Sequence, residues 1–221
     1  MSQTPDTLKL VPVGPVSPEL LAWLAGCLAE ALGRPTSVGD EIPLPARGYD
    51  PRRRQYRGET ILDALRALPA PGVGRVLGLT EADCYAPGLN FIFGQAVLDG
   101  RAALVALPRL RPSFYGLAED PELYQQRALK ECVHELGHTW GLRQCPDPGC
   151  VMHFSNTLAD TDAKGAAFCA RCQPAHAAGR GWSRSSRSAA ALTTRKCFRG
   201  PAFAGQSATQ AAIRPYASRE H

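Results

Sequence analysis

Residues 134–145 read HELGHTWGLRQC, and this segment determines how the rest of the chain is interpreted. It begins with an HExxH motif, His134-Glu135-Leu136-Gly137-His138. On a helix, residues four apart lie one above the other on the same face. Two imidazoles placed in this way can bind one zinc ion, and Glu135 then lies beside the metal. The motif therefore predicts two metal ligands, His134 and His138, and a catalytic base within one helical turn.

Zinc suits this arrangement because it makes water acidic. A zinc-bound water can have a pKa near 7, against roughly 9 for aqueous zinc. The ion thus generates a nucleophile near neutral pH and polarises a peptide carbonyl. Glu135 would accept the water proton and later deliver it to the leaving amine.

A bare HExxH also occurs by chance in ordinary amphipathic helices with two surface histidines. Three features favour the metal site. Asp120-Pro121 is a helix-start signal, and an apolar face follows it. Gly141 lies three residues after His138, where the chain must bend to bring round a third ligand. A cysteine array follows directly. The apolar face comprises Leu129, Cys132, Val133, Leu136 and Trp140.

Four of the eight cysteines form two close pairs downstream of this helix. Cys145 and Cys150 are separated by four residues, Cys169 and Cys172 by two, and eighteen residues lie between the pairs. This is the pattern of a four-thiolate structural zinc. Pro and Gly within the first pair form turns that let both sulfur atoms face one point. The alternative is four buried reduced cysteines without a metal.

The segments before the helix predict an α/β fold, a twisted mixed sheet with packed helices. Ser17-Pro18 and Gly33 mark the start and end of a first helix, with apolar residues at helical spacing between them. Residues 45–58 are polar and predict a loop. The pattern predicts strands at 8–13, 36–44, 75–79, 91–97 and 102–107, and a second helix at 59–68.

Charge is distributed unevenly along the chain. Residues 176–221 hold eight Lys or Arg and one Glu, so this segment carries +7 and residues 1–175 carry −2 of the total of +5. We expect a basic, disordered tail at 176–221 and one domain at 1–175. A near-neutral domain argues against a nucleic-acid partner. No secretory signal or membrane-spanning segment is visible, so we expect a cytoplasmic monomer that acts on peptides or proteins.

From His134 to Cys172 the sequence follows the pattern H-E-x-x-H-x-x-G-x-x-x-C-x4-C-x-M-x16-C-x-x-C. This pattern resembles the archaemetzincins, a family of small cytoplasmic zinc peptidases, and the resemblance extends from about Leu8 to Gln173. It implies a compact metzincin-like domain in which an active-site helix is followed by a four-cysteine zinc subdomain. It also implies two zinc ions, one catalytic at the histidine pair and one structural at the four cysteines.

The resemblance implies two further roles. Met152 would be the Met-turn residue, an apolar floor beneath the metal. An edge strand over 90–97 would pair with extended substrate by β-augmentation. Its candidate substrate-binding residues are Asn90, Phe91, Ile92, Phe93 and Gly94.

The chain departs from the metzincin pattern at the third zinc ligand. That position, six residues after His138, holds Gln144 instead of histidine. Gln144 could ligate through its oxygen, a second water could replace it, or the site could bind zinc poorly. His153 could be imagined as a substitute, but it directly follows Met152. We therefore expect a metallopeptidase, with aminopeptidase preference as one option. The alternative is a catalytically impaired, zinc-stabilised module that binds proteins or peptides.

Overall fold

The computed structural model describes residues 7–69 and 72–173, which form a mixed sheet flanked by helices. The predicted tail at 176–221 lies outside these residues. The main sheet has the strand order β2-β1-β5-β8-β7. Its first four strands run parallel, and β7 pairs antiparallel with β8 at one edge. The strands are β1 Leu8–Pro12, β2 Thr36–Val38, β5 Arg75–Thr80, β7 Gly94–Ala96 and β8 Ala102–Ala106.

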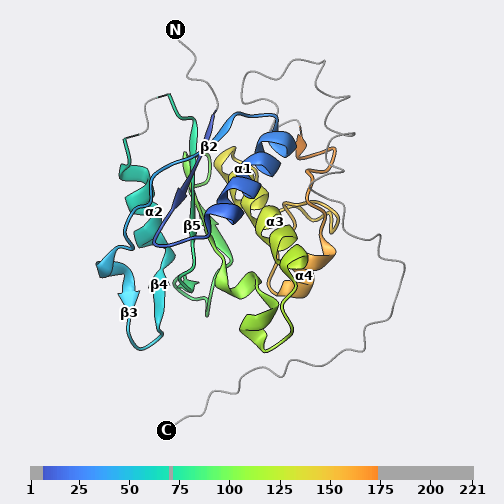
Figure 1. Ribbon diagram of the computed structural model, residues 1–221. Helices are drawn as coiled ribbons and strands as arrows, with labels where there is room; N and C mark the ends of the chain where they lie inside the picture. Colours follow the sequence, from blue (N-terminus) through green and yellow to red (C-terminus); the bar gives the residue numbers. More distant parts are fainter. Residues whose placement is uncertain (1–6, 70–71, 174–221) are drawn as a thin grey trace.

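Helices cover both faces of this sheet. Helix α1 (Pro18–Leu32) and helix α3 (Pro121–Thr139) lie on one face, and α2 (Gly58–Ala67) lies on the other (Figure 1). Both start signals predicted from the sequence act as caps. The Ser17 hydroxyl accepts a hydrogen bond from the Leu20 amide, and the Asp120 carboxylate accepts one from the Leu123 amide. Each cap satisfies an amide that the helix itself leaves unpaired.

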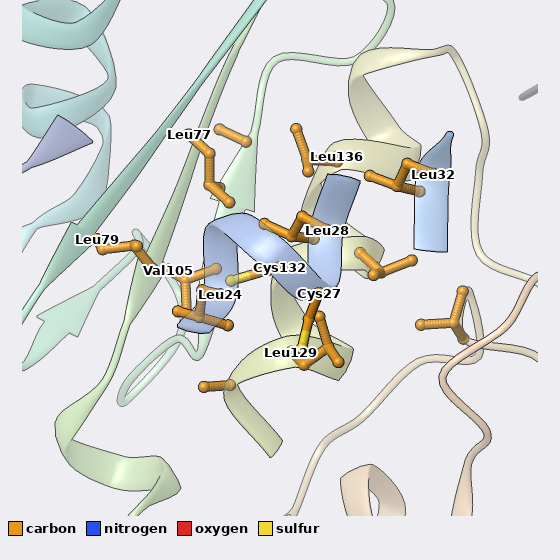
Figure 2. Packing of buried hydrophobic residues seen from close by; sticks show 14 of the residues in the cluster. Leu24, Cys27, Leu28, Leu32, Leu77, Leu79, Val105, Leu129, Cys132 and Leu136 are labelled. Atoms are coloured by element: carbon orange, nitrogen blue, oxygen red, sulfur yellow. The ribbon is translucent and has the colours of Figure 1, made fainter. Parts of the chain in front are cut away.

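The core follows the alternation of side chains along the strands. Leu77 and Leu79 of β5 face α1 and α3, whereas Val76 faces α2. Figure 2 shows the larger cluster, in which two helices meet the sheet. It includes Leu24, Cys27, Leu28, Leu32, Leu129, Cys132 and Leu136. Burial of this apolar face fixes α3, and with it the HExxH motif, against the strands.

The predicted loop at 45–58 is wrong in part, because it contains two short strands. Strand β3 (Tyr49–Asp50) pairs with β4 (Gln55–Arg57), and β4 pairs with β6 (Cys84–Tyr85) in a second, three-stranded sheet. These strands of two or three residues are too short to give an alternating apolar pattern. Three 3-10 turns complete the connections, at Ala46–Gly48, Pro108–Leu110 and Pro112–Tyr115.

Two predicted strands are shorter in the structure. The strand expected at 36–44 ends at Val38, and only an isolated bridge from Val13 to Ile42 continues it. The strand expected at 91–97 is limited to β7, because Ile92 bridges to Cys84 of β6 and its amide donates to the Cys84 carbonyl. The chain there joins the second sheet before it reaches β8.

A short helix that the sequence analysis missed, α4 (Leu158–Ala163), lies between the two cysteine pairs. A capping box between Thr157 and Asp160 starts it. Charged side chains of α3 hold it in place. Arg127 forms a two-pronged ion pair with Asp162 at 2.7 and 2.6 Å. The Lys130 ammonium donates to the Thr161 and Asp162 carbonyls at 3.0 Å.

The most buried link between α3 and this segment is an ion pair. The Lys164 ammonium lies 2.9 Å from Glu131, and both side chains are almost completely excluded from solvent. The Thr161 hydroxyl also donates to Glu131, at 3.2 Å. A buried charge without its partner is costly, so each residue depends on the other.

Within the described ranges, no helix is long and apolar enough to span a bilayer.

The Glu131–Lys164 pair gives a prediction about stability. Replacing Lys164 with Met leaves a buried carboxylate unpaired, so we expect the free energy of unfolding to fall by about 3–5 kcal/mol. The double variant Glu131→Gln, Lys164→Met removes both charges and should recover much of this loss. Urea unfolding in zinc-containing buffer measures both. If the free energy of unfolding of Lys164→Met lay within about 0.5 kcal/mol of the parent value, the usual range for surface substitutions, the pairing would be contradicted.

Candidate active site and four-cysteine cluster

The two histidines of the HExxH motif lie at the C-terminal end of α3 with their rings close together. The Nδ1 atom of His134 lies 2.7 Å from the Val151 carbonyl, and that of His138 lies 2.7 Å from the Leu142 carbonyl. A carbonyl oxygen can only accept, so each Nδ1 carries the ring proton. Each neutral ring therefore presents an unprotonated Nε2.

These two Nε2 atoms face each other at 3.2 Å. Two nitrogens bound to one tetrahedral zinc at about 2.0–2.1 Å lie roughly 3.3 Å apart. Burial lowers the pKa of His134 to about 4 and also lowers that of His138, which keeps both rings neutral. Two neutral rings with facing lone pairs are suited to a shared cation, so the residues present fit a zinc ion.

Glu135 lies between α3 and the edge strand. Its carboxyl is buried, and one oxygen, Oε2, has no hydrogen-bond partner in the described structure. Burial raises the pKa of Glu135 well above its ordinary value, and the nearby Glu131 charge adds to the effect. A carboxyl with a raised pKa and an unused oxygen can accept and hold a proton near neutral pH.

Gly94 allows strand β7 to lie directly against this carboxyl. A Cβ atom built on Gly94 would come within 2.5 Å of Glu135 Oε1. The turn after β7 is also fixed to α3, because the Asp99 amide donates to the His138 carbonyl at 3.0 Å. The segment that contains β7 therefore contacts helix α3 at two points, Gly94 and Asp99.

Gly141 ends the helix and turns the chain back toward the histidines, as the sequence predicted. Its φ of +80° is favourable for glycine and strained for other residues. The turn places the Leu142 carbonyl on His138 Nδ1 and brings the Gln144 amide to 3.5 Å from His138 Nε2. Rotation of the amide by 180° would present Gln144 Oε1 at nearly the same point. The third position of the motif therefore lies beside the histidine pair.

Met152 lies fully buried against the turn of α3 that separates the two histidines. A Cβ atom on Gly137 would clash with the Met152 sulfur, so the small residue within HELGH makes room for the methionine. His153 turns elsewhere, since its Nδ1 lies 3.0 Å from the Cys145 carbonyl. It does not line the cleft with the histidine pair.

The four cysteines of the two pairs converge as the spacing predicts. Their sulfur atoms all lie within 4.8 Å of one another, and those of Cys145 and Cys169 are 3.8 Å apart. Thiolates on one tetrahedral zinc, with bonds of about 2.3 Å, are separated by roughly 3.8 Å. The cluster therefore could bind a metal ion through Cys145, Cys150, Cys169 and Cys172.

Local hydrogen bonds favour the thiolate form of Cys145, whereas burial raises the pKa of Cys150 and of Cys172. Burial opposes ionisation of Cys145, but the Arg171 guanidinium, 3.5 Å from its sulfur, and a backbone amide contact outweigh burial and lower its pKa to about 7. The Cys169 amide donates to the Cys150 sulfur at 3.4 Å. Thiolates are the form in which cysteine binds metal.

A cleft of about 580 Å³ opens over the histidines. One wall is the segment from Gly88 to Ala96, which contains all five predicted substrate-binding residues. Asn90, Phe91, Ile92 and Phe93 precede β7 and are not part of the strand, whereas Gly94 begins it. Strand β7 is an edge of the sheet, with no further strand beside it among the described residues.

The cleft also contains residues that the sequence analysis did not single out. Glu131, one turn before Glu135, lines it, and helical spacing from the motif could have identified this residue. Part of the lining comes from the segment after Met152. There the Ser155 hydroxyl is buried and has no partner within residues 7–69 and 72–173, and Phe154 is exposed. Arg143 lines the cleft beside Gln144.

The chain resembles known proteins along most of its length. A model of peptidase family M54 matches residues 49–176, more than half of the chain. The archaemetzincin of Methanopyrus kandleri is 48% identical over 145 residues, which cover 66% of this chain and 79% of that protein. The archaemetzincin of Pyrococcus furiosus is 41% identical over 173 residues, covering 76% and 90%.

Solved structures of related proteins show the same similarity. The crystal structure of the Methanopyrus kandleri archaemetzincin superimposes with a TM-score of 0.71 at 41% identity, covering 80% of this chain and 96% of that one. A zinc-dependent peptidase from Methanocorpusculum labreanum gives 0.68 at 29% identity, covering 76% and 99%. With the HExxH helix, the Met152 turn and the four-cysteine cluster in place, the chain belongs to peptidase family M54, the archaemetzincins, and is a zinc-dependent metallopeptidase.

Proposed function

We propose that the catalytic zinc is held by His134 and His138, with Gln144 at the third position, and that Glu135 is the general base. The observation that supports this most strongly is the pair of Nε2 atoms facing each other at 3.2 Å while both Nδ1 protons are engaged by carbonyls. The partner-free Oε2 of Glu135 supports the second part.

Gln144 makes this centre unusual in the strength of its third ligand, but not in its charge. Two imidazoles and an amide form a neutral donor set, and an amide oxygen is a weaker zinc ligand than an imidazole nitrogen. We expect zinc to bind more loosely here than at the four thiolates of the cysteine cluster. The 3.5 Å distance between its amide and His138 Nε2 supports this place for Gln144 in the site.

When bound, zinc supplies Lewis acidity, which polarises a peptide carbonyl and acidifies water. The chain supplies the proton transfer. Glu135 accepts a proton at Oε2, holds it in a buried site where the neutral carboxyl is favoured, and returns it to the leaving amine. The Val151 and Leu142 carbonyls keep the imidazoles in the tautomer that presents Nε2.

Peptide substrate would lie along β7 in extended form. The outer edge of this strand can add a peptide through backbone hydrogen bonds. Gly94 brings that edge close to Glu135, so a peptide paired with β7 would pass over the base. The residues from Asn90 to Phe93 would continue this wall of the cleft.

We further propose that Cys145, Cys150, Cys169 and Cys172 hold a second zinc with a structural role. The spacing of their sulfur atoms and the hydrogen bonds to Cys145 and Cys150 support it. No position is left for water or substrate when four thiolates surround one zinc, so this ion would not take part in catalysis.

Glu135→Gln tests the assignment of the base. We expect kcat/KM for peptide hydrolysis to fall by about 10²–10⁴-fold, the range for loss of general acid–base catalysis, while zinc content stays unchanged because Glu135 is not a ligand. Zinc is measured by elemental analysis of the same preparation. Glu122→Gln, an exposed glutamate on the same helix, is the matched control. Unchanged cleavage by Glu135→Gln would contradict the assignment.

Gln144→His tests the third position. An imidazole there should tighten the catalytic zinc by about 10–100-fold, the scale of changes seen at metal sites, and raise peptidase activity. Competition with a chromophoric chelator measures the affinity, and the chelator should remove one zinc per chain before the other. Gln126→His, which adds a histidine elsewhere on α3, should change neither. Tighter zinc without any peptide cleavage would instead favour a binding module at this centre.

A further inference from the structure

The exposed charge of the cleft lies on Arg143. Three charged residues line the cleft, and two of them, Glu131 and Glu135, are buried. Glu131 is paired with Lys164 at 2.9 Å, and the carboxyl of Glu135 lies against Gly94 of strand β7. Arg143 is exposed, and its side chain has no hydrogen bond or ion pair among the described residues. The exposed and unpaired charge that a bound peptide would meet is therefore that of Arg143.

The position of Arg143 is fixed by its neighbours on both sides. The Leu142 carbonyl accepts from His138 Nδ1 at 2.7 Å, and the Gln144 amide lies 3.5 Å from His138 Nε2. The Cα atom of Arg143 thus belongs to a segment that contacts the same histidine at either end. Arg143 lines the same cleft as that histidine and Glu135.

We propose that Arg143 selects peptides that carry a carboxylate next to the bond being cleaved. Guanidinium pairs with a carboxylate through two parallel N–H···O bonds, a geometry that neutral or basic side chains cannot supply. The inference rests on the proposed active site, and it adds a substrate class: peptides with Asp or Glu, or with a free C-terminal carboxylate, at that point.

The experiment compares fluorogenic peptides that differ by one group. One pair has an internal Glu or Gln and an amidated end, and a second pair ends in a free carboxylate or an amide. We expect the parent enzyme to favour the carboxylate member of at least one pair by about fivefold in kcat/KM, which corresponds to a partly exposed ion pair. The pair that responds identifies the source of the carboxylate. The preference should shrink at high salt.

Two substitutions locate the preference. Arg143→Gln should bring the carboxylate-to-amide ratio close to one, and Arg143→Glu should invert it. Arg52 provides the control, because it is another exposed arginine whose side chain has no partner in the described part of the chain. It lies in the turn between β3 and β4, outside the cleft. Arg52→Gln and Arg52→Glu should keep the parent ratio. A parent ratio near one for both pairs, an unchanged ratio in Arg143→Glu, or an equal change in Arg52→Glu would overturn the proposal.

A binding measurement separates this inference from the catalytic assignment. Labelled versions of the same peptides are titrated into the Glu135→Gln protein, and their Kd values are compared by fluorescence anisotropy. The inference is supported if this protein binds the carboxylate peptides more tightly and if adding Arg143→Glu inverts that preference. The result does not depend on the rate of turnover. The parent enzyme could instead hydrolyse the peptides with carboxylate-to-amide ratios near one in both Kd and kcat/KM. That result would refute the role of Arg143 and leave the catalytic assignment intact.

Discussion

The active site depends on two hydrogen bonds that point the histidine lone pairs at one another. Each Nδ1–H donates to a backbone carbonyl, from Val151 for His134 and from Leu142 for His138. Without these acceptors the rings could rotate or change tautomer, and the two Nε2 atoms would no longer converge. Neither carbonyl comes from α3 itself. The helix supplies the spacing, and the segments that follow it supply the orientation.

Those segments also connect the cysteine cluster to the histidine pair. Val151 lies between Cys150 of the cluster and Met152 beneath the helix, and its amide donates to the Ala167 carbonyl. The Cys145 amide in turn donates to the Met152 carbonyl at 2.9 Å. A metal held by the four sulfurs would therefore fix the carbonyl that orients His134. On this account the cluster supports catalysis through the backbone, without touching substrate.

The sequence predicted the elements that are long enough to carry a clear apolar pattern. Helices α1 and α3 and strands β1, β5 and β8 were found in this way, and the cysteine spacing predicted the cluster. Helix α4 was missed although its capping box, Thr157 to Asp160, is visible in the sequence, because six residues show too little periodicity. The Glu131–Lys164 pair joins residues far apart in the chain, so no local pattern could predict it. The truncated edge strand likewise reflects a tertiary contact, from Ile92 to Cys84.

The central claim is that one zinc lies between His134 and His138 and a second among the four cysteines. Crystals of the full chain, grown with zinc, can be measured on both sides of the zinc absorption edge. We predict two anomalous peaks per chain that vanish below the edge. One should lie about 2.0–2.1 Å from both Nε2 atoms, and the other about 2.3 Å from each sulfur of Cys145, Cys150, Cys169 and Cys172. A peak at the sulfurs with none between the histidines in the presence of zinc would contradict the account.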